Sequence, residues 1–144
     1  RYSMSTDVLG GIVQIVAGQP FDHFLQERIF QPLGMVDTDF FVPAEKLPRF
    51  AATYGPGEHG GLKLVDGVET STYTRPARCP SGGGGLVATI GDYLRFAQML
   101  LNRGELDGVR LLGPKTVDWM TTNHLPPSVH PFDDRPALAW ASAF

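Results

Sequence analysis

The chain has 144 residues, of which 42% are hydrophobic and 19% charged, and its formal net charge at pH 7 is −3. This length suffices for one domain with a real hydrophobic core, and the composition is ordinary for a globular protein. The negative charge offers no basic surface to nucleic acid, so we expect no nucleic-acid partner. No apolar run approaches the ~20 residues of a membrane-spanning helix, so we expect no membrane span.

The single cysteine, Cys79, excludes a framework of internal disulfides. Arg78 beside it would favour a reactive thiolate if the two side chains met. A lone cysteine is more often a small buried apolar residue, and this is the interpretation that we prefer.

The two ends of the chain favour a piece of a larger protein. The chain starts at Arg1, and residues 137–144 alternate large and small side chains as a strand packed on one face would. We therefore interpret residues 1–144 as a single incomplete domain. On this interpretation the absence of a signal peptide gives no information about localisation, and the sequence assigns neither a compartment nor an oligomeric state.

Two helices joined by a tight turn are predicted at the start of the chain. Apolar residues at helical spacing form a stripe of Val8, Leu9, Ile12, Val13 and Val16, which Gly18 ends. Ser3, Ser5 and Thr6 are plausible helix caps. Pro20 fits the first position of a second helix, whose apolar face comprises Phe21, Phe24, Leu25 and Ile29.

The middle of the chain is predicted to be irregular and β-rich. Proline interrupts residues 40–48, and residues 51–64 have the glycine-rich turn of a hairpin. Gly55-x-Gly57-x-x-Gly60 matches a dinucleotide fingerprint only in spacing, because no strand precedes it and no helix follows. Residues 65–80 are polar and favour strand and loop at the edge of a cleft.

The most organised stretch runs from Ser81 to Leu112. It opens with four consecutive glycines, whose backbone can lie against a bound molecule. Thr89 and Asp92 have the spacing of a capping box. A buried helix should follow, and Gly104 should end it in a left-handed turn. Its predicted buried face comprises Ile90, Tyr93, Leu94, Ala97, Leu100 and Leu101.

The last elements complete an α+β pattern. Residues 109–112 are predicted to form a short strand or an extended turn. Pro114 opens a helix through Met120 with Val117 and Met120 inward, and a proline-rich loop covers residues 123–136. Helices mixed with short strands predict an α+β fold.

The residues alone give few candidates for chemistry. None of the four histidines has the spacing of a zinc site, and His130 with Asp133 and Asp134 fits solvated loop charges better than a metal centre. Asp37 and Asp39 could act as acid and base, but they lie in a turn where Asp forms local hydrogen bonds. No Gly-x-Ser-x-Gly nucleophile elbow is present. We predict no metal and no cofactor.

Three ordered passages resemble a known family. They are Tyr2-Ser3-Met4 leading into Asp7-Val8-Leu9-Gly10, the run from Ile29 to Phe40, and the stretch from Ser81 to Leu112. Together they resemble the serine β-lactamase-like superfamily (class C-like), and within it the family VIII carboxylesterases. The resemblance implies part of a serine β-lactamase/penicillin-binding-protein-like fold, mostly its helical region with part of the sheet.

The resemblance implies an acyl-enzyme mechanism that needs residues from outside this chain. In such enzymes a Ser-x-x-Lys motif supplies the nucleophile, a Tyr-x-Asn-type motif supplies a proton-relaying tyrosine, and a Lys-Thr-Gly-type strand completes the pocket. Only the second motif is present, and its tyrosine maps onto Tyr2. Lys115-Thr116 is followed by Val117 and opens a helix, so we interpret it as structural. The upstream Ser-x-x-Lys part and the downstream sheet strands would lie beyond the chain, and the 144-residue piece should be inactive alone.

Met4 departs from the family pattern, which has asparagine at this position to hold the amide of the substrate. A thioether cannot donate a hydrogen bond, which favours ester substrates. We expect Met4, Ser81, Gly82, Gly83 and Gly84 to bind substrate beside Tyr2. The alternatives are a β-lactamase or D-alanyl-D-alanine peptidase, and a non-catalytic binding homologue. The expected partner is a small-molecule ester or β-lactam.

Overall fold

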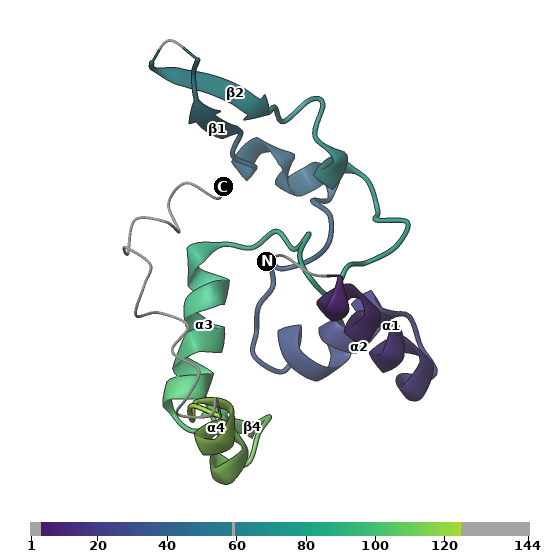
Figure 1. The fold of residues 1–144 in the computed structure, drawn as a ribbon, viewed down its shortest axis with the longest axis vertical. Helices are drawn as coiled ribbons and strands as arrows, with labels where there is room; N and C mark the ends of the chain where they lie inside the picture. Colours follow the sequence, from purple (N-terminus) through teal and green to yellow (C-terminus); the bar gives the residue numbers. More distant parts are fainter. Residues whose placement is uncertain (1–3, 59, 125–144) are drawn as a thin grey trace.

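The computed structural model describes residues 4–58 and 60–124 (Figure 1). Helices dominate, and the strands form two separate two-stranded antiparallel sheets, β1-β2 and β3-β4. In chain order the elements are α1 (Ser5–Ala17), α2 (Phe21–Leu25), the π-helical η1 (Gln26–Phe30), the 3-10 helix η2 (Ala44–Arg49), β1 (Thr53–Pro56), β2 (Leu62–Asp66), the 3-10 turn η3 (Thr72–Thr74), α3 (Ile90–Leu101), β3 (Glu105–Leu106), β4 (Val109–Arg110) and α4 (Pro114–Met120).

Helices α1 and α2 form the predicted pair. Gly18 ends α1 in the left-handed conformation with φ of 66°, and its amide donates to the Gln14 carbonyl, as a glycine at a helix end allows. The predicted caps are wrong, because Met4 occupies the cap position of α1 without a side-chain hydrogen bond. Pro20 caps α2 rather than occupying its first turn.

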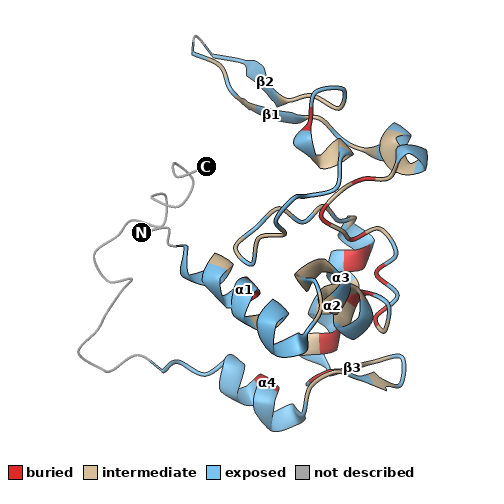
Figure 2. Ribbon diagram, turned by 90° about the vertical axis from the view of Figure 1, so that its right-hand side faces the viewer, coloured by how far each residue is buried: buried red, intermediate tan, exposed pale blue. Residues whose placement is uncertain are grey.

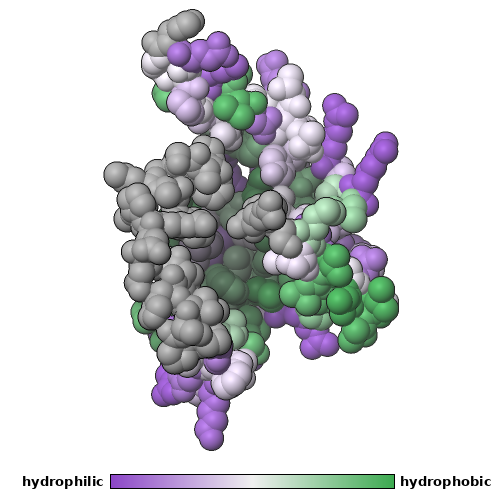
Figure 3. All heavy atoms as spheres, viewed as in Figure 1, coloured by the Kyte–Doolittle hydropathy of each residue, from purple (hydrophilic) through white to green (hydrophobic). Residues whose placement is uncertain are grey.

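The apolar stripe of α1 does not face the described core. Val8 and Val16 are 61% and 82% exposed, and the same holds in lesser degree for Leu9 and Ile12. Figure 3 shows the resulting hydrophobic patch over this helix. Gly10 is the one residue of α1 that is buried. The prediction of a helix is correct, but the described residues cover the side of α1 that carries Gly10 and leave the apolar stripe exposed.

The core lies where the end of η1 meets α3. Phe30, Leu33, Met35 and Met99 form its buried cluster, and Leu33 and Met99 are essentially inaccessible at 0% and 1% exposure. Residues packed around this cluster come from α2, η1, α3, β3 and the segment after β4. Gly34, with φ of 65°, turns the chain out of η1 so that Met35 points back into the core. Figure 2 shows the buried positions gathered between these elements.

Helix α3 begins as predicted but uses its acidic residue differently. The Thr89 hydroxyl accepts from the Asp92 amide at 3.2 Å, which satisfies one free donor of the first turn. Asp92 does not complete a reciprocal capping box. Its carboxylate accepts from the Asp37 amide at 2.7 Å and from the Thr38 hydroxyl at 2.8 Å. Asp92 and Thr38 are both buried.

The predicted buried face of α3 is wrong for the described residues. Ile90, Tyr93 and Leu94 are at least 60% exposed, as is Leu101, whereas Asp92 and Met99 are the buried positions. The periodicity of the sequence predicted an apolar stripe on one side of α3. A neighbouring side, which carries Asp92 and Met99, packs against the turn after η1 and the core instead. Leu100 lies partly buried against the core, as expected.

The hairpin prediction is confirmed, with β1 and β2 pairing antiparallel and Gly55 opposite Lys63. Figure 1 shows this hairpin projecting beyond the helices. The glycines that resembled a dinucleotide fingerprint lie in β1 and its turn. Most of residues 65–80 are loop rather than strand, and residues 40–48 contain η2, which was not predicted.

The elements after α3 follow the prediction closely. Gly104 has φ of 97°, and a Cβ there would overlap the Leu112 carbonyl, so only glycine fits this turn. Pro114 occupies the first turn of α4 and Val117 is buried, but Met120 is 57% exposed, contrary to expectation. The predicted loop at 123–136 and the strand at 137–144 lie almost entirely outside the described residues.

Two further expectations concern exposure and length. Cys79 is exposed, so its interpretation as a buried residue is wrong. Within residues 4–58 and 60–124, no helix has both the length and the apolar character needed to cross a membrane.

Replacing the buried acceptor at Asp92 should destabilise the protein more than replacing an exposed acid. Asp92→Ala leaves the Asp37 amide and Thr38 hydroxyl without their acceptor, and a buried unsatisfied donor costs about 1–3 kcal/mol. Asp118→Ala is the control, because Asp118 pairs with Arg103 at the surface, where an ion pair contributes about 1 kcal/mol or less. Denaturant unfolding of the full-length protein measures both. Equal losses would contradict the role assigned to Asp92.

Candidate functional site

The start of α1 carries Met4, one of the residues that the sequence singled out. Met4 caps this helix and is 75% exposed, so its thioether is free to meet a molecule in solution. Tyr2, the predicted catalytic residue, lies outside the described residues, and its role stays a prediction. Three residues beyond Met4, Asp7 lies in the first turn of the helix.

The glycine loop lies directly against this first turn. A Cβ on Gly82 would overlap the Thr6 carbonyl oxygen, and a Cβ on Gly10 would come within 3.1 Å of the Gly82 Cα. Position 82 needs glycine because its backbone lies too close to α1 for any side chain, whereas a Cβ at position 10 would make a tight contact with the Gly82 backbone. Gly85 needs glycine for a different reason, its φ of 87°.

Hydrogen bonds tie the same loop to α1. The Ser81 hydroxyl donates to the Asp7 carboxylate and accepts from the Gly83 amide at 2.9 Å. The contact between Ser81 and Asp7 joins residues 74 positions apart in the chain. Farther along the loop, Val87 exchanges two backbone hydrogen bonds with Asp39, of 2.8 and 3.1 Å. The loop is therefore anchored near both of its ends.

The structure thus places Ser81, Gly82 and Gly83 beside the helix start that carries Met4, while Gly84 is exposed in the same loop. Their binding of substrate stays a prediction. Sequence reasoning missed the partners of this loop, Thr6, Asp7 and Gly10. Nothing in the sequence pairs Asp7 with a serine so far along the chain.

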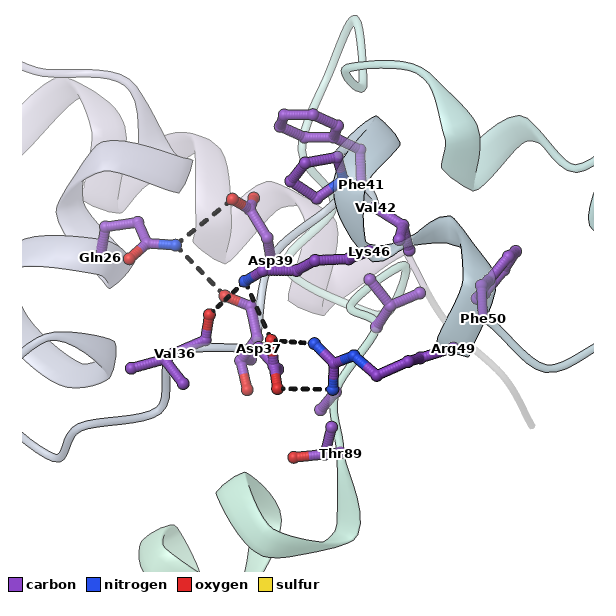
Figure 4. Close-up of a pocket in the computed structure, with 14 residues that line it drawn as sticks. Gln26, Val36, Asp37, Asp39, Phe41, Val42, Lys46, Arg49, Phe50 and Thr89 are labelled. Atoms are coloured by element: carbon purple, nitrogen blue, oxygen red, sulfur yellow. Dashed lines mark hydrogen bonds and ion pairs between the residues drawn. The ribbon is translucent and has the colours of Figure 1, made fainter.

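A separate pocket of about 110 Å³ lies between η1, η2 and the loop before α3. Figure 4 shows Asp37 between Lys46 and Arg49, and Gln26 reaching across to Asp39. Arg49 donates to both oxygens of the Asp37 carboxylate, at 2.8 and 3.0 Å, and Lys46 lies 2.9 Å from it. Because these charges already pair with one another, we interpret the pocket as structural.

These contacts change the proton affinity of Asp37. Hydrogen bonds from Arg49 and then Lys46 favour the ionised carboxylate and hold the pKa of Asp37 well below its usual range. In turn, the hydrogen bond to Asp37 raises the pKa of the Arg49 guanidinium. At neutral pH Asp37 is therefore a charged partner in an ion-pair cluster, which argues against the acid–base role considered for this residue.

No group of three or more His, Cys, Asp or Glu residues in the described part of the chain is arranged to hold a metal ion. His130, Asp133 and Asp134, the weak metal candidate of the sequence, lie outside that part.

Comparison with known proteins identifies the family. The family described as Beta-lactamase matches residues 1–142, so the chain belongs to the beta-lactamase family. The resemblance inferred from the three sequence passages is confirmed. The unliganded structure of simvastatin synthase (LovD) from Aspergillus terreus has a TM-score of 0.74 and 30% identity, covering 89% of this chain and 31% of that one. The partial β-lactamase-like fold is therefore confirmed as well.

Two relatives extend the comparison. Protein Rv1367c of Mycobacterium tuberculosis (strain ATCC 25618 / H37Rv) is 42% identical over 124 residues, which cover 86% of this chain and 30% of the relative. Esterase EstB of Burkholderia gladioli is 35% identical over 114 residues, covering 69% and 29% respectively. The chain therefore spans about 30% of the length of the curated relatives that it matches.

The ion-pair cluster around Asp37 predicts a pH dependence. A carboxyl whose pKa is lowered by folding stabilises the protein above its unfolded pKa of about 3.9, and this contribution is lost as the pH falls toward the lower folded pKa. Arg49→Ala should therefore lower the free energy of unfolding at neutral pH, and its difference from wild type should shrink below about pH 4. Arg28→Ala, at an exposed position of η1, is the control. Denaturant unfolding of the full-length protein across pH provides the measurement, and a constant difference for Arg49→Ala would contradict the assignment.

Proposed function

We propose that the full-length protein is a serine hydrolase that cleaves carboxylic esters through an acyl-enzyme intermediate, with its nucleophile outside this chain. The observation that carries the proposal is the Tyr2-Ser3-Met4 passage leading into α1 of a beta-lactamase-family chain. An esterase among the relatives supports the ester substrate.

In this proposal Tyr2 is the general base. An unperturbed phenol titrates near ~10, and a neighbouring lysine ammonium would favour the phenolate at neutral pH. The phenolate accepts the proton of the serine hydroxyl as the serine oxygen bonds to the ester carbonyl carbon. The same proton then passes to the alkoxide as the alcohol leaves. Water attacks the acyl-enzyme, releases the carboxylic acid and restores the serine.

Met4 supports esters over β-lactams and peptides. It stands two residues after Tyr2, where the family pattern has an asparagine that holds a substrate amide. The Met4 thioether has no hydrogen to donate, whereas an ester needs no such anchor. A β-lactamase or D-alanyl-D-alanine peptidase activity is the competing possibility, and a chromogenic cephalosporin assayed beside a short-chain nitrophenyl ester distinguishes it.

The isolated 144-residue chain should hydrolyse neither substrate, because the proposal locates the nucleophile beyond it. Activity of the isolated chain that a serine-directed reagent abolishes would contradict this part of the proposal.

Tyr2→Phe in the full-length protein tests the proposed base. The variant keeps the ring and removes only the hydroxyl, so substrate binding should survive while kcat for a nitrophenyl ester falls by about 10²–10⁴-fold, the usual contribution of general acid–base catalysis. Tyr54→Phe is the matched control, because Tyr54 lies exposed in β1 and should keep wild-type kcat. Wild-type turnover by Tyr2→Phe would make Tyr2 a packing residue.

Met4→Asn tests the basis of the substrate preference. The new amide can hold a substrate amide, and one such hydrogen bond contributes about 0.5–1.5 kcal/mol, which is roughly tenfold in specificity at most. We expect the ratio of kcat/KM for the cephalosporin to that for the ester to rise by a small factor. Met120→Asn, at an exposed methionine of α4, should leave this ratio unchanged. An unchanged or lowered ratio for Met4→Asn would assign the ester preference to another cause.

A further inference from the structure

We propose that Asp7 and Ser81 are positioning residues, whose hydrogen bond holds the glycine loop in register with the first turn of α1. This inference rests on the proposed function, because it concerns the same site. We call the two residues and the Gly83 amide the loop latch. The latch joins the described parts of the site, namely the helix start at Met4 and the loop of residues 81–84.

The Ser81 hydroxyl connects the two sides of the latch. A hydroxyl has one donor and two acceptor positions. In Ser81 the donor is used by the Asp7 carboxylate, and the Gly83 amide donates to the same oxygen. The hydroxyl thus links a side chain of α1 to the backbone of the glycine loop. Hydrogen bonds to an ionised acceptor are stronger than neutral ones, so this link suits a precise placement of the loop.

The packing of Gly82 restricts the position of the loop relative to α1. Its backbone lies against the Thr6 carbonyl and Gly10 with no space for a Cβ. The loop cannot move toward α1, and the latch opposes its movement away. Backbone hydrogen bonds between Val87 and Asp39 fix the far end. Gly84, the exposed glycine between these anchors, is therefore presented at a defined position near the first turn of α1.

A latch of this kind acts on catalysis through geometry. A misplacement of about 1 Å in a group that positions substrate can cost roughly 10²-fold in rate. Neither Asp7 nor Ser81 needs to touch the substrate for its loss to matter. We therefore expect turnover to fall in variants that lose this hydrogen bond. The size of the fall should not correlate with the loss of unfolding free energy.

The chain contains a matched pair for comparison. The Ser71 hydroxyl donates to the Asp66 carboxylate at 2.7 Å and accepts from the Tyr73 amide at 3.2 Å. Serine, acid and an amide two residues farther on are thus arranged as in the loop latch, but the pair lies between β2 and η3. Ser71→Ala removes the same chemical contacts from a loop that does not pack on the start of α1.

The experiment compares variants of the full-length protein in ester hydrolysis and in amide hydrogen exchange of residues 81–87. Ser81→Ala and Asp7→Ala should each lower kcat/KM about tenfold, mainly through kcat, and speed exchange in this loop. The double variant should lose no more than either single one, because both remove one interaction. Asp7→Asn should stay within about threefold of wild type, because its amide oxygen still accepts from Ser81.

Ser71→Ala, at an equal or greater loss of unfolding free energy, should keep wild-type kcat and wild-type exchange at residues 81–87. If Asp7→Ala fails to fold, Ser81→Ala compared with Ser81→Thr, which keeps the hydroxyl, makes the same test. Unchanged loop exchange in Ser81→Ala, multiplicative losses in the double variant, or an equal kinetic loss in Ser71→Ala would each overturn the proposal. If the wild-type protein hydrolyses no ester, the proposed function fails, whereas the exchange data still decide whether the latch holds the loop.

Discussion

The hydrogen bonds of the Asp92 carboxylate hold α3 in place against the segment that follows η1, and the rest of the described structure depends on this contact. The carboxylate accepts from the Asp37 amide and the Thr38 hydroxyl, 55 and 54 positions earlier in the chain, and so fixes α3 to the turn that follows the core residues of η1. Because Asp92 is buried, losing it would leave polar groups unsatisfied away from water.

Local signals in the sequence predicted much of the fold, and long-range contacts account for what they missed. The Thr89 cap, the Gly104 turn and the Pro114 helix start follow from the chemistry of single residues. The buried face of α3 could not be predicted, because periodicity identifies an apolar stripe without saying which neighbour exists to cover it. Asp92 is buried through partners distant in sequence, and Cys79 is exposed although its residue type favours burial.

Part of the candidate site was likewise predictable from the sequence, and part depends on long-range contacts. The four glycines signalled a backbone that lies close to something, and the structure places that backbone against Thr6 and Gly10 of α1. The pairing of Ser81 with Asp7 has no sequence signal, since both are common residues 74 positions apart. The helix start and the loop both lie within the residues that match the beta-lactamase family. The exposed apolar patch of α1 and the ion-pair cluster at Asp37 lie outside the proposed chemistry.

The position of the acyl group in the sequence tests the proposed acyl-enzyme intermediate. The full-length protein is mixed with a slowly hydrolysed ester, quenched during turnover, digested and analysed by mass spectrometry. We expect one acyl group per molecule, attached to a serine in a peptide outside residues 1–144, and no stable acyl adduct on Ser81. Ester turnover without any acylated peptide, or acylation of a residue within 1–144, would contradict it.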